Sequence, residues 1–109
     1  MKYAVVDIGS NSMRLSAYDV EKTTFKTLFK EKIMAGLAGY VENGRLSEAG
    51  IQRACEGLLE FKATLNTLEL EQASVFATAS LRNVCNTDQA VRRLRDATGL
   101  PVAVLSGQE

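Results

Sequence analysis

Three strands are predicted before residue 35 from the spacing of apolar positions. Residues 2–8 carry apolar side chains on successive positions, which is typical of a central strand covered on both faces. After a turn at residues 9–11, apolar residues alternate with polar ones from 13 to 18, which predicts a second strand that returns antiparallel. Residues 19–23 are polar and predict the turn into a third strand.

The third predicted strand spans residues 24–34 and has the composition of an edge strand. Strict alternation places Lys26, Lys30 and Lys32 on one of its faces. Lysines on an outer strand discourage pairing with another molecule, so solubility and edge protection explain them. Residues 35–46 contain three glycines and are predicted to form a loop that crosses from the sheet to a helix.

A long amphipathic helix is predicted to follow this loop. Ser47 is suited to cap its first turn, because a serine hydroxyl accepts a hydrogen bond from a backbone N–H group there. The apolar residues recur at helical spacing over about five turns, which indicates a stripe that faces the core. The stripe consists of Ile51, Ala54, Cys55, Leu58, Phe61, Leu65 and Leu68.

A strand, a helix and a further strand complete the predicted elements. Residues 72–79 form a short, largely buried strand. Thr87 marks the start of a helix that Gly99 and Pro101 stop, and residues 101–105 form the last strand. The predicted buried side of this helix consists of Val91, Leu94 and Ala97.

The order of these elements predicts an α/β fold built on one mixed sheet. A three-stranded meander is followed by helix, strand, helix and strand, and right-handed crossovers make the last two strands parallel to the first. We therefore predict five strands in the order 3-2-1-4-5, with helices after strands 3 and 4. The carboxyl ends of strands one, four and five then meet where Asp7, Thr78 and Ser106 lie, an edge suited to phosphate binding.

Length and composition narrow the candidate chemistry. The 109 residues suffice for one domain with its own core. Thirteen basic and thirteen acidic residues give a net charge of zero, so no overall field would attract nucleic acid or a membrane surface. The chain has no histidine, which excludes a Ser-His or Cys-His pair within it and leaves carboxylates and hydroxyls for catalysis.

The cysteines and the amino terminus carry no sign of a zinc site, a disulfide framework or an export signal. Cys55 and Cys85 lie far apart and lack the spacing of metal ligands. Cys55 is predicted to be a small core residue of the long helix. The chain enters a strand directly and has no run of ~20 apolar residues, so a cytoplasmic protein is expected.

The segment from Asp7 to Ser12 is the main candidate for a functional site. A carboxylate at the end of a buried strand can hold Mg²⁺, directly or through its water ligands. Gly9 lets the backbone approach an anion closely, and the N–H groups and short side chains of Ser10 and Asn11 can surround phosphate oxygens. Such residues are also common in hairpin turns, so a simple turn and a phosphate loop are both open on this segment alone.

Three stretches of the chain together resemble the amino-terminal half-domain of the exopolyphosphatase and guanosine pentaphosphate phosphohydrolase family. They read Asp7-Ile-Gly-Ser-Asn-Ser-Met-Arg-Leu15, Ala77-Thr-Ala-Ser-Leu-Arg-Asn83 and Val104-Leu-Ser-Gly-Gln-Glu109, in the family's order and spacing. The family belongs to the actin-like ATPase superfamily, so the resemblance implies a ribonuclease H-like half-domain. It covers residues 1–109 as a single phosphate-binding domain. Family members continue with a helix, a second phosphate loop and a second domain, so truncation before that helix is expected.

The resemblance implies a role for several polar residues. Asp7 would help to hold Mg²⁺, and Arg82 would contact the phosphates of the substrate unless it is a plain surface arginine. Glu109 matches the first of two family glutamates, and the second, which orients the attacking water, would come directly after it. Arg14 is assigned no role. The phosphate-binding residues implied in this way are Gly9, Ser10, Asn11, Ser12, Thr78, Ser80, Arg82 and Gly107.

The implied activity is hydrolysis of terminal phosphoanhydride bonds with Mg²⁺ as cofactor. The substrates would be inorganic polyphosphate or guanosine pentaphosphate, and family members are commonly homodimers. This chemistry needs positioning of water and neutralisation of charge, which a chain without histidine can supply. Two alternatives stay open, namely a non-catalytic phosphate- or nucleotide-binding module of actin-like fold and a domain like those of sugar or acetate kinases. For the 109 residues alone we expect weak phosphate binding without turnover.

Overall fold

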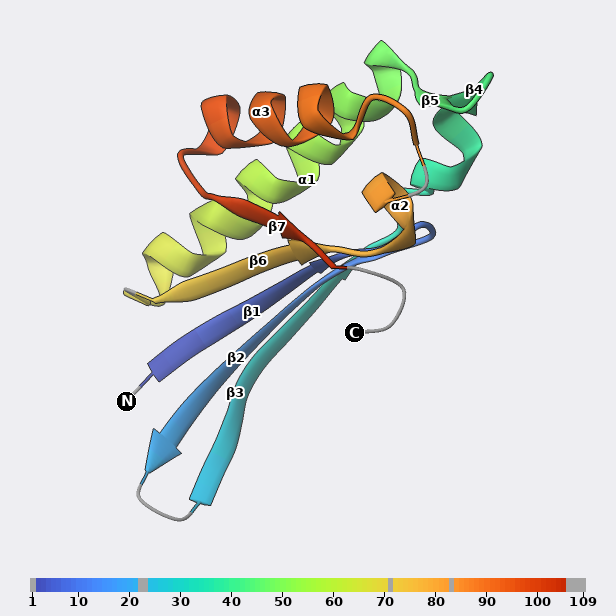
Figure 1. Cartoon of the computed structure of the whole chain (residues 1–109). Helices are drawn as coiled ribbons and strands as arrows, with labels where there is room; N and C mark the ends of the chain where they lie inside the picture. The colour runs from blue at the N-terminus through green and yellow to red at the C-terminus, as the bar shows by residue number, and fades with distance from the viewer. Residues whose placement is uncertain (1, 22–23, 71, 83, 106–109) are drawn as a thin grey trace.

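The computed structural model describes residues 2–21, 24–70, 72–82 and 84–105. Helices α1 and α3 lie side by side over one face of a five-stranded sheet (Figure 1). In chain order the elements are β1 (Lys2–Ile8), β2 (Met13–Glu21), β3 (Thr24–Ile33), the 3-10 helix η1 (Leu37–Tyr40), β4 (Val41–Glu42), β5 (Arg45–Leu46), α1 (Glu48–Thr67), β6 (Ala73–Ala77), α2 (Ala79–Arg82), α3 (Thr87–Thr98) and β7 (Val102–Val104).

The strand order of the large sheet confirms the predicted topology. The order is β3-β2-β1-β6-β7, which is the predicted 3-2-1-4-5 once the small strands β4 and β5 are numbered. β1, β2 and β3 form an antiparallel meander, while β6 pairs parallel to β1 and β7 parallel to β6. The last two strands are shorter than predicted, because β6 ends at Ala77 and β7 covers only residues 102–104.

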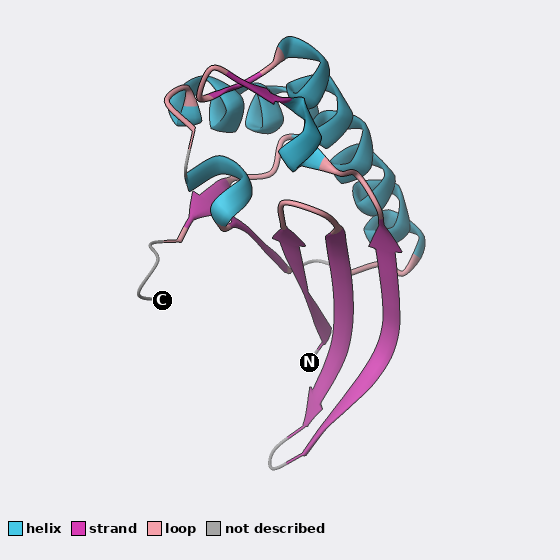
Figure 2. Cartoon of the chain, turned by 90° about the vertical axis from the view of Figure 1, so that its right-hand side faces the viewer, coloured by secondary structure: helices cyan, strands magenta, loops and turns pink. Residues whose placement is uncertain are grey.

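β1 is buried on one face only. Ala4, Val6 and Ile8 are fully buried, whereas the alternate side chains Tyr3 and Asp7 are only half-buried. Successive apolar positions predicted burial on both faces, which is wrong for this structure because α1 and α3 pack on the same side (Figures 1 and 2). The side of the sheet without these helices is called the open face below.

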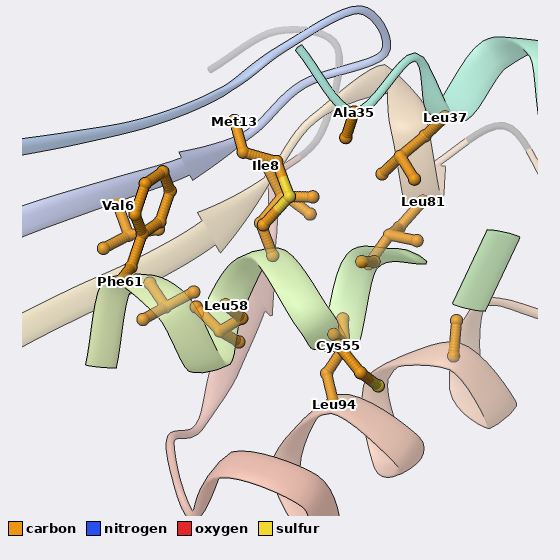
Figure 3. Close-up of a cluster of buried hydrophobic side chains, with 14 of the residues drawn as sticks. Val6, Ile8, Met13, Ala35, Leu37, Cys55, Leu58, Phe61, Leu81 and Leu94 are labelled. Carbon is orange, nitrogen blue, oxygen red and sulfur yellow. The ribbon is translucent and has the colours of Figure 1, made fainter. Parts of the chain in front are cut away.

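Side chains from α1 and from the sheet meet in one hydrophobic core (Figure 3). The predicted apolar stripe of α1 is buried from Ile51 to Leu65. Leu68 is 38% exposed, because the helix ends at Thr67 and the chain turns away. Cys55 is buried within the stripe as predicted, and the structure contains no disulfide between the two cysteines.

The buried side of α3 differs in part from the predicted one. Leu94 is buried as predicted, but Ala97 is exposed and Val91 is only half-buried. The fully buried positions Ala90, Leu94 and Thr98 are spaced by four residues, so the contact line runs along one ridge of the helix. None of the described helices is long and apolar enough to span a membrane.

The starts of the two long helices lie where the sequence predicts them. The Ser47 hydroxyl accepts a hydrogen bond from the Gly50 N–H at 3.1 Å, as expected of an N-cap. α3 begins at Thr87, but the Thr87 hydroxyl does not cap it and instead donates to backbone carbonyls, including that of Val84 at 2.9 Å. The four-residue helix α2 was not predicted, because one turn is too short to show a hydrophobic period.

The segment 35–46 is largely regular, so its prediction as a plain loop was wrong. It contains η1 and a two-stranded ribbon of β4 and β5. The buried Asn86 side chain holds this ribbon: its Oδ1 accepts from the Leu46 N–H at 2.9 Å, and its Nδ2 donates to the Leu46 carbonyl at 3.0 Å. Strands of two residues carry no alternating pattern, and the residue that ties them down lies 40 positions further along the chain.

β2 and β3 form a long hairpin that extends beyond the helices (Figure 2). β2 continues to Glu21, so the turn predicted for residues 19–23 is shorter than expected, and residues 22–23 lie outside the described part. Polar residues at 19 and 21 were read as a turn because this end of the hairpin has no helix over it and polar side chains are tolerated there.

A β-bulge interrupts the pairing of β2 with β3. The register shifts between Ala17 and Tyr18, and a bulge turns the side chains beyond it to the other face. Lys26 lies beyond the bulge and pairs with a residue on the opposite face from Lys30 and Lys32. The prediction that the three lysines share one face was wrong, because strict alternation fails at a bulge.

Candidate functional site

The loop of residues 9–12, called the 9–12 loop below, joins β1 to β2 at the edge where the parallel strands end. The Gly9 N–H donates to the Ser12 carbonyl at 3.0 Å and closes the loop. A Cβ atom on residue 9 would lie 2.8 Å from that carbonyl oxygen. Glycine is therefore required at this position by the close approach of the backbone to itself.

The carbonyl groups of the 9–12 loop are engaged with other parts of the backbone. The Ser10 carbonyl accepts from the Ala38 N–H and the Asn11 carbonyl from the Gly36 N–H, both at 2.9 Å. By contrast, the N–H groups of Ser10, Asn11 and Ser12 have no acceptor in the part of the chain that the structure describes. Successive free N–H groups in a turn can bind an anion, and this loop presents three of them while the carbonyls of Ser10, Asn11 and Ser12 already accept hydrogen bonds.

Residues 36–38 hold the loop in this state, and sequence reasoning assigned them only to a connecting segment. Gly36 has φ 63°, a left-handed conformation that favours glycine. Gly36 was the one feature of the sequence that could have pointed to this segment. A glycine alone does not predict the hydrogen bond from residue 36 to residue 11, because that bond depends on the tertiary arrangement.

Asp7 lies on the open face of β1 between Arg14 of β2 and Phe76 of β6. Its Oδ1 atom is buried and has no hydrogen-bond partner in the described structure. Burial raises the pKa of Asp7 above its ordinary value, and the positive charge of Arg14 partly opposes this shift. A buried carboxylate oxygen without a donor is costly, which indicates that a ligand normally satisfies it.

The unpaired oxygen of Asp7 fits a role in holding Mg²⁺. Mg²⁺ prefers oxygen ligands and in phosphate sites is commonly held by one or two carboxylates together with water and phosphate oxygens. Within the described residues, no group of three or more acidic, cysteine or histidine side chains could form a complete cage. A magnesium ion at this site would therefore take its ligands from Asp7, from water and from the bound phosphate.

Thr78 and Ser80 were both predicted to bind phosphate, and the structure separates them. The Thr78 N–H donates to the Ile8 carbonyl at 3.4 Å, and the Thr78 side chain is half-exposed beside the end of β1. Ser80 is only 4% exposed, and its hydroxyl donates to the same carbonyl at 2.6 Å. The Ser80 hydroxyl therefore fastens α2 to β1, and the phosphate contact inferred for Ser80 stays a prediction.

Three further predicted residues cannot be placed by their side chains. Arg82 is the last residue of α2, and its side chain lies outside the described structure. Gly107 and Glu109 belong to residues 106–109, which also lie outside the described part, as does Ser106. The roles inferred for these residues stay predictions.

Arg14 is a neighbour of the site that sequence reasoning passed over. It is the cross-strand partner of Asp7, and the two side chains share the open face. Residues equally distant from a hairpin loop pair across the strands, so the spacing of residues 7 and 14 around the 9–12 loop was an available signal. It was missed because an arginine alternating with apolar residues also fits a solvated strand face.

The sequence is similar to a known phosphatase family. The model of the Ppx/GppA phosphatase family matches residues 5–109. A guanosine-5'-triphosphate,3'-diphosphate pyrophosphatase of Vibrio vulnificus is 32% identical over 108 residues, which are 98% of this chain and 22% of that protein. The chain therefore spans less than a quarter of this curated relative.

Solved structures of that family have the same fold. The Ppx/GppA family member of Aquifex aeolicus matches with a TM-score of 0.90 and 28% identity, over 98% of this chain and 35% of that one. An exopolyphosphatase from Cytophaga hutchinsonii matches with a TM-score of 0.92 and 25% identity, over 99% of this chain and 35% of that one. The match covers the complete sheet and both long helices, and it spans about a third of the length of the two larger proteins.

Proposed function

The chain belongs to the Ppx/GppA phosphatase family, and from this premise we propose that it supplies one phosphate-binding half of a phosphoanhydride hydrolase. Its sheet is of the actin-like, ribonuclease H-like class. The proposed reaction removes the terminal phosphate of inorganic polyphosphate or of guanosine pentaphosphate. The observation that carries the proposal is the 9–12 loop: three of its N–H groups have no acceptor in the described structure, and they come shortly after Asp7, whose Oδ1 atom has no partner there.

Each part of the loop has a task in this reaction. The N–H groups of Ser10, Asn11 and Ser12 donate to the oxygens of the terminal phosphate and stabilise the negative charge that the transition state spreads over them. The hydroxyl of Thr78 lies at the same edge and can donate to a phosphate oxygen from the β6 side. Asp7 would hold Mg²⁺, which when bound neutralises phosphate charge.

Arg82 and the end of the chain complete the proposal. Arg82 belongs to the stretch 77–83 that resembles the family motif, and on that resemblance we propose that its guanidinium contacts the phosphates that the 9–12 loop binds. The residue that orients the attacking water is proposed to lie after Glu109, whose place in the family motif is next to it. Among the described residues the 9–12 loop is one such phosphate loop, and we propose that a second element closes around the substrate.

The names of two relatives correspond to the two proposed substrates. One relative is named as a guanosine-5'-triphosphate,3'-diphosphate pyrophosphatase and another as an exopolyphosphatase. Both names describe attack on a phosphoanhydride, which supports a phosphatase over the kinase-like alternative. Because the chain covers 22% of the first and 35% of the second, we assign the reaction to a longer protein and phosphate binding to these residues.

The proposal is tested by calorimetric titration of the 109-residue chain with pyrophosphate, in the presence and absence of Mg²⁺. We expect weak binding that requires Mg²⁺ and is lost in Asp7→Asn, and no release of phosphate from polyphosphate. Glu56→Gln, which removes an exposed carboxylate of α1, serves as the matched control and should leave binding unchanged. Binding that is independent of both Mg²⁺ and Asp7 would contradict the proposal.

A further inference from the structure

A row of positive charge lies on the open face of the sheet beside the 9–12 loop. Arg14 of β2 pairs in register with Lys32 of β3, and Ser16 pairs with Lys30. Since alternate residues of a strand share a face, the four side chains lie together on the face that also carries Asp7. The row starts next to the loop, because Arg14 is only two positions after Ser12.

These residues surround a hollow of about 300 Å³, which we call the cationic groove. Glu31 also lines it, but the Glu31 carboxylate accepts a hydrogen bond from the Thr64 hydroxyl of α1 at 2.9 Å and is thus drawn to the other face. The charged groups free to reach into the groove are therefore cations. The residues that line the groove are Arg14, Leu15, Ser16, Lys30, Glu31 and Lys32.

The two lysines of the groove are not used by the fold, whereas Arg14 faces Asp7 and its charge partly opposes the rise in the Asp7 pKa. Arg14, Lys30 and Lys32 are exposed, and none of them forms an ion pair or hydrogen bond in the part of the chain that the structure describes. Lys30 and Lys32 lie beside the positive charge of Arg14, which is unfavourable without further negative charge, and nothing in the packing of the sheet requires charge at the two lysine positions. Edge protection alone would be served by lysines on either face of β3, so it does not explain why three cations converge on one hollow.

We propose that the cationic groove binds the inner phosphate groups of a linear polyphosphate whose terminal phosphate occupies the 9–12 loop. This inference rests on the proposed function. Each inner phosphate carries negative charge, and the flexible ammonium groups of lysines can follow such a repeating anion without a fixed register. A chain anchored at the loop would meet Arg14 first and then the two lysines, in the order in which the strands place them.

The test compares a long-chain polyphosphate with pyrophosphate, which is too short to leave the loop. The double variant Lys30→Gln and Lys32→Gln is expected to weaken binding of the long chain roughly fivefold, at the magnitude of two exposed ion pairs, and to leave pyrophosphate binding unchanged. Lys26→Gln is the control and is compared with Lys30→Gln alone, because each removes one charge from β3 and Lys26 lies on the opposite face. Circular dichroism establishes that the variants are folded.

Each other outcome overturns the proposal. Equal loss for both ligands, or equal loss in Lys26→Gln, would show that only general surface charge is involved. Competition by duplex DNA at the same phosphate concentration would assign the groove to nucleic acid. If the double variant binds long chains like wild type while Asp7→Asn does not, phosphate binding by the 9–12 loop is supported and binding of inner phosphates by the groove is contradicted. If Asp7→Asn binds both ligands like wild type, the proposed function fails and, with it, the assignment of the groove.

Discussion

At the scale of single residues, Asp7 shows a conflict between stability and binding. Its side chain is buried enough for the pKa to rise, and one carboxylate oxygen has no donor in the described structure. Ionised Asp7 therefore destabilises the folded chain, which is typical of a group kept for a ligand. Arg14, its partner across the hairpin, only partly offsets this cost.

The cost of Asp7 predicts that Asp7→Asn stabilises the fold at neutral pH. The folded pKa of Asp7 lies above the ordinary value of 3.8, so its ionisation is harder in the folded state than in the unfolded state. The gain in melting temperature of Asp7→Asn should be absent below pH 3.8, grow as pH rises through the raised pKa and then stay constant.

Thermal unfolding of Asp7→Asn and of the control Glu56→Gln between pH 3 and pH 8 checks this prediction. A variant that is less stable than wild type at neutral pH, or a difference that does not change with pH, would show that the Asp7 carboxylate is satisfied in the folded chain. The control should follow wild type across the range, because Glu56 is exposed on α1.

The sequence was informative about single residues where chemistry follows position along one strand. Asp7, Gly9 and Thr78 lie at the predicted edge of the sheet, because Asp7 is the second-last residue of β1 and the other two directly follow a strand. Ser80 could not be judged in the same way, because its burial depends on how one short turn of helix folds back onto β1. Arg14 was passed over for the related reason that its importance comes from its partner on another strand.

At the scale of elements, α1 approaches its neighbours closely at two glycines. A Cβ on Gly50 would lie 2.6 Å from the Tyr40 Cβ and 2.6 Å from the Leu46 Cδ1. A Cβ on Gly57 would instead meet the Met13 Sδ at 2.7 Å and its Cε at 3.1 Å, which belong to the far end of a flexible side chain. The two positions therefore differ in how easily the neighbour can move.

Gly50→Ala is predicted to lower the free energy of unfolding by about 1 kcal/mol. Overpacking against an atom next to the backbone costs about 1–3 kcal/mol, whereas alanine gains about 1 kcal/mol of helix propensity over glycine. Gly57→Ala is the comparison, and it should be less destabilising because the Met13 thioether can rotate away. Urea denaturation of both variants measures the difference in the free energy of unfolding. If Gly50→Ala is more stable than wild type, η1 and β5 do not pack against α1 as closely as the structure shows.

The elements themselves were predictable in proportion to their length. The alternation of β2, the stripe of α1 and the two helix starts are local patterns that the sequence displays directly. The bulge near Ala17 and the β4–β5 ribbon are not, because one depends on pairing with a second strand and the other on the distant Asn86 side chain. Where the local sequence pattern gave no prediction, tertiary contacts determined the strand pairing.

At the scale of the whole molecule, the open face leaves apolar side chains half-covered. Val5 of β1 and Phe76 of β6 lie there on neighbouring strands, opposite to α1 and α3. The sequence predicted burial of β1 on both faces, so the residue types are those of a covered face. We therefore predict that the 109-residue chain self-associates through this face at high concentration.

Phe76→Gln is predicted to shift this association toward monomer in sedimentation velocity. Leu59→Gln is the matched control, because Leu59 is 43% exposed on α1 and lies away from the open face. If both variants change the association equally, or if wild type is monomeric at every concentration, the open face is not the surface through which the chains meet.

We propose above all that the 9–12 loop binds phosphate through three N–H groups that have no acceptor among the described residues. The most direct measurement follows the backbone amide signals of the chain by NMR during titration with pyrophosphate and Mg²⁺. The account predicts the largest shifts at the amides of Ser10, Asn11 and Ser12, and a small shift at Gly9, whose N–H already donates to the Ser12 carbonyl. Shifts concentrated elsewhere in the chain, or no shifts in the loop at saturating ligand, would contradict it.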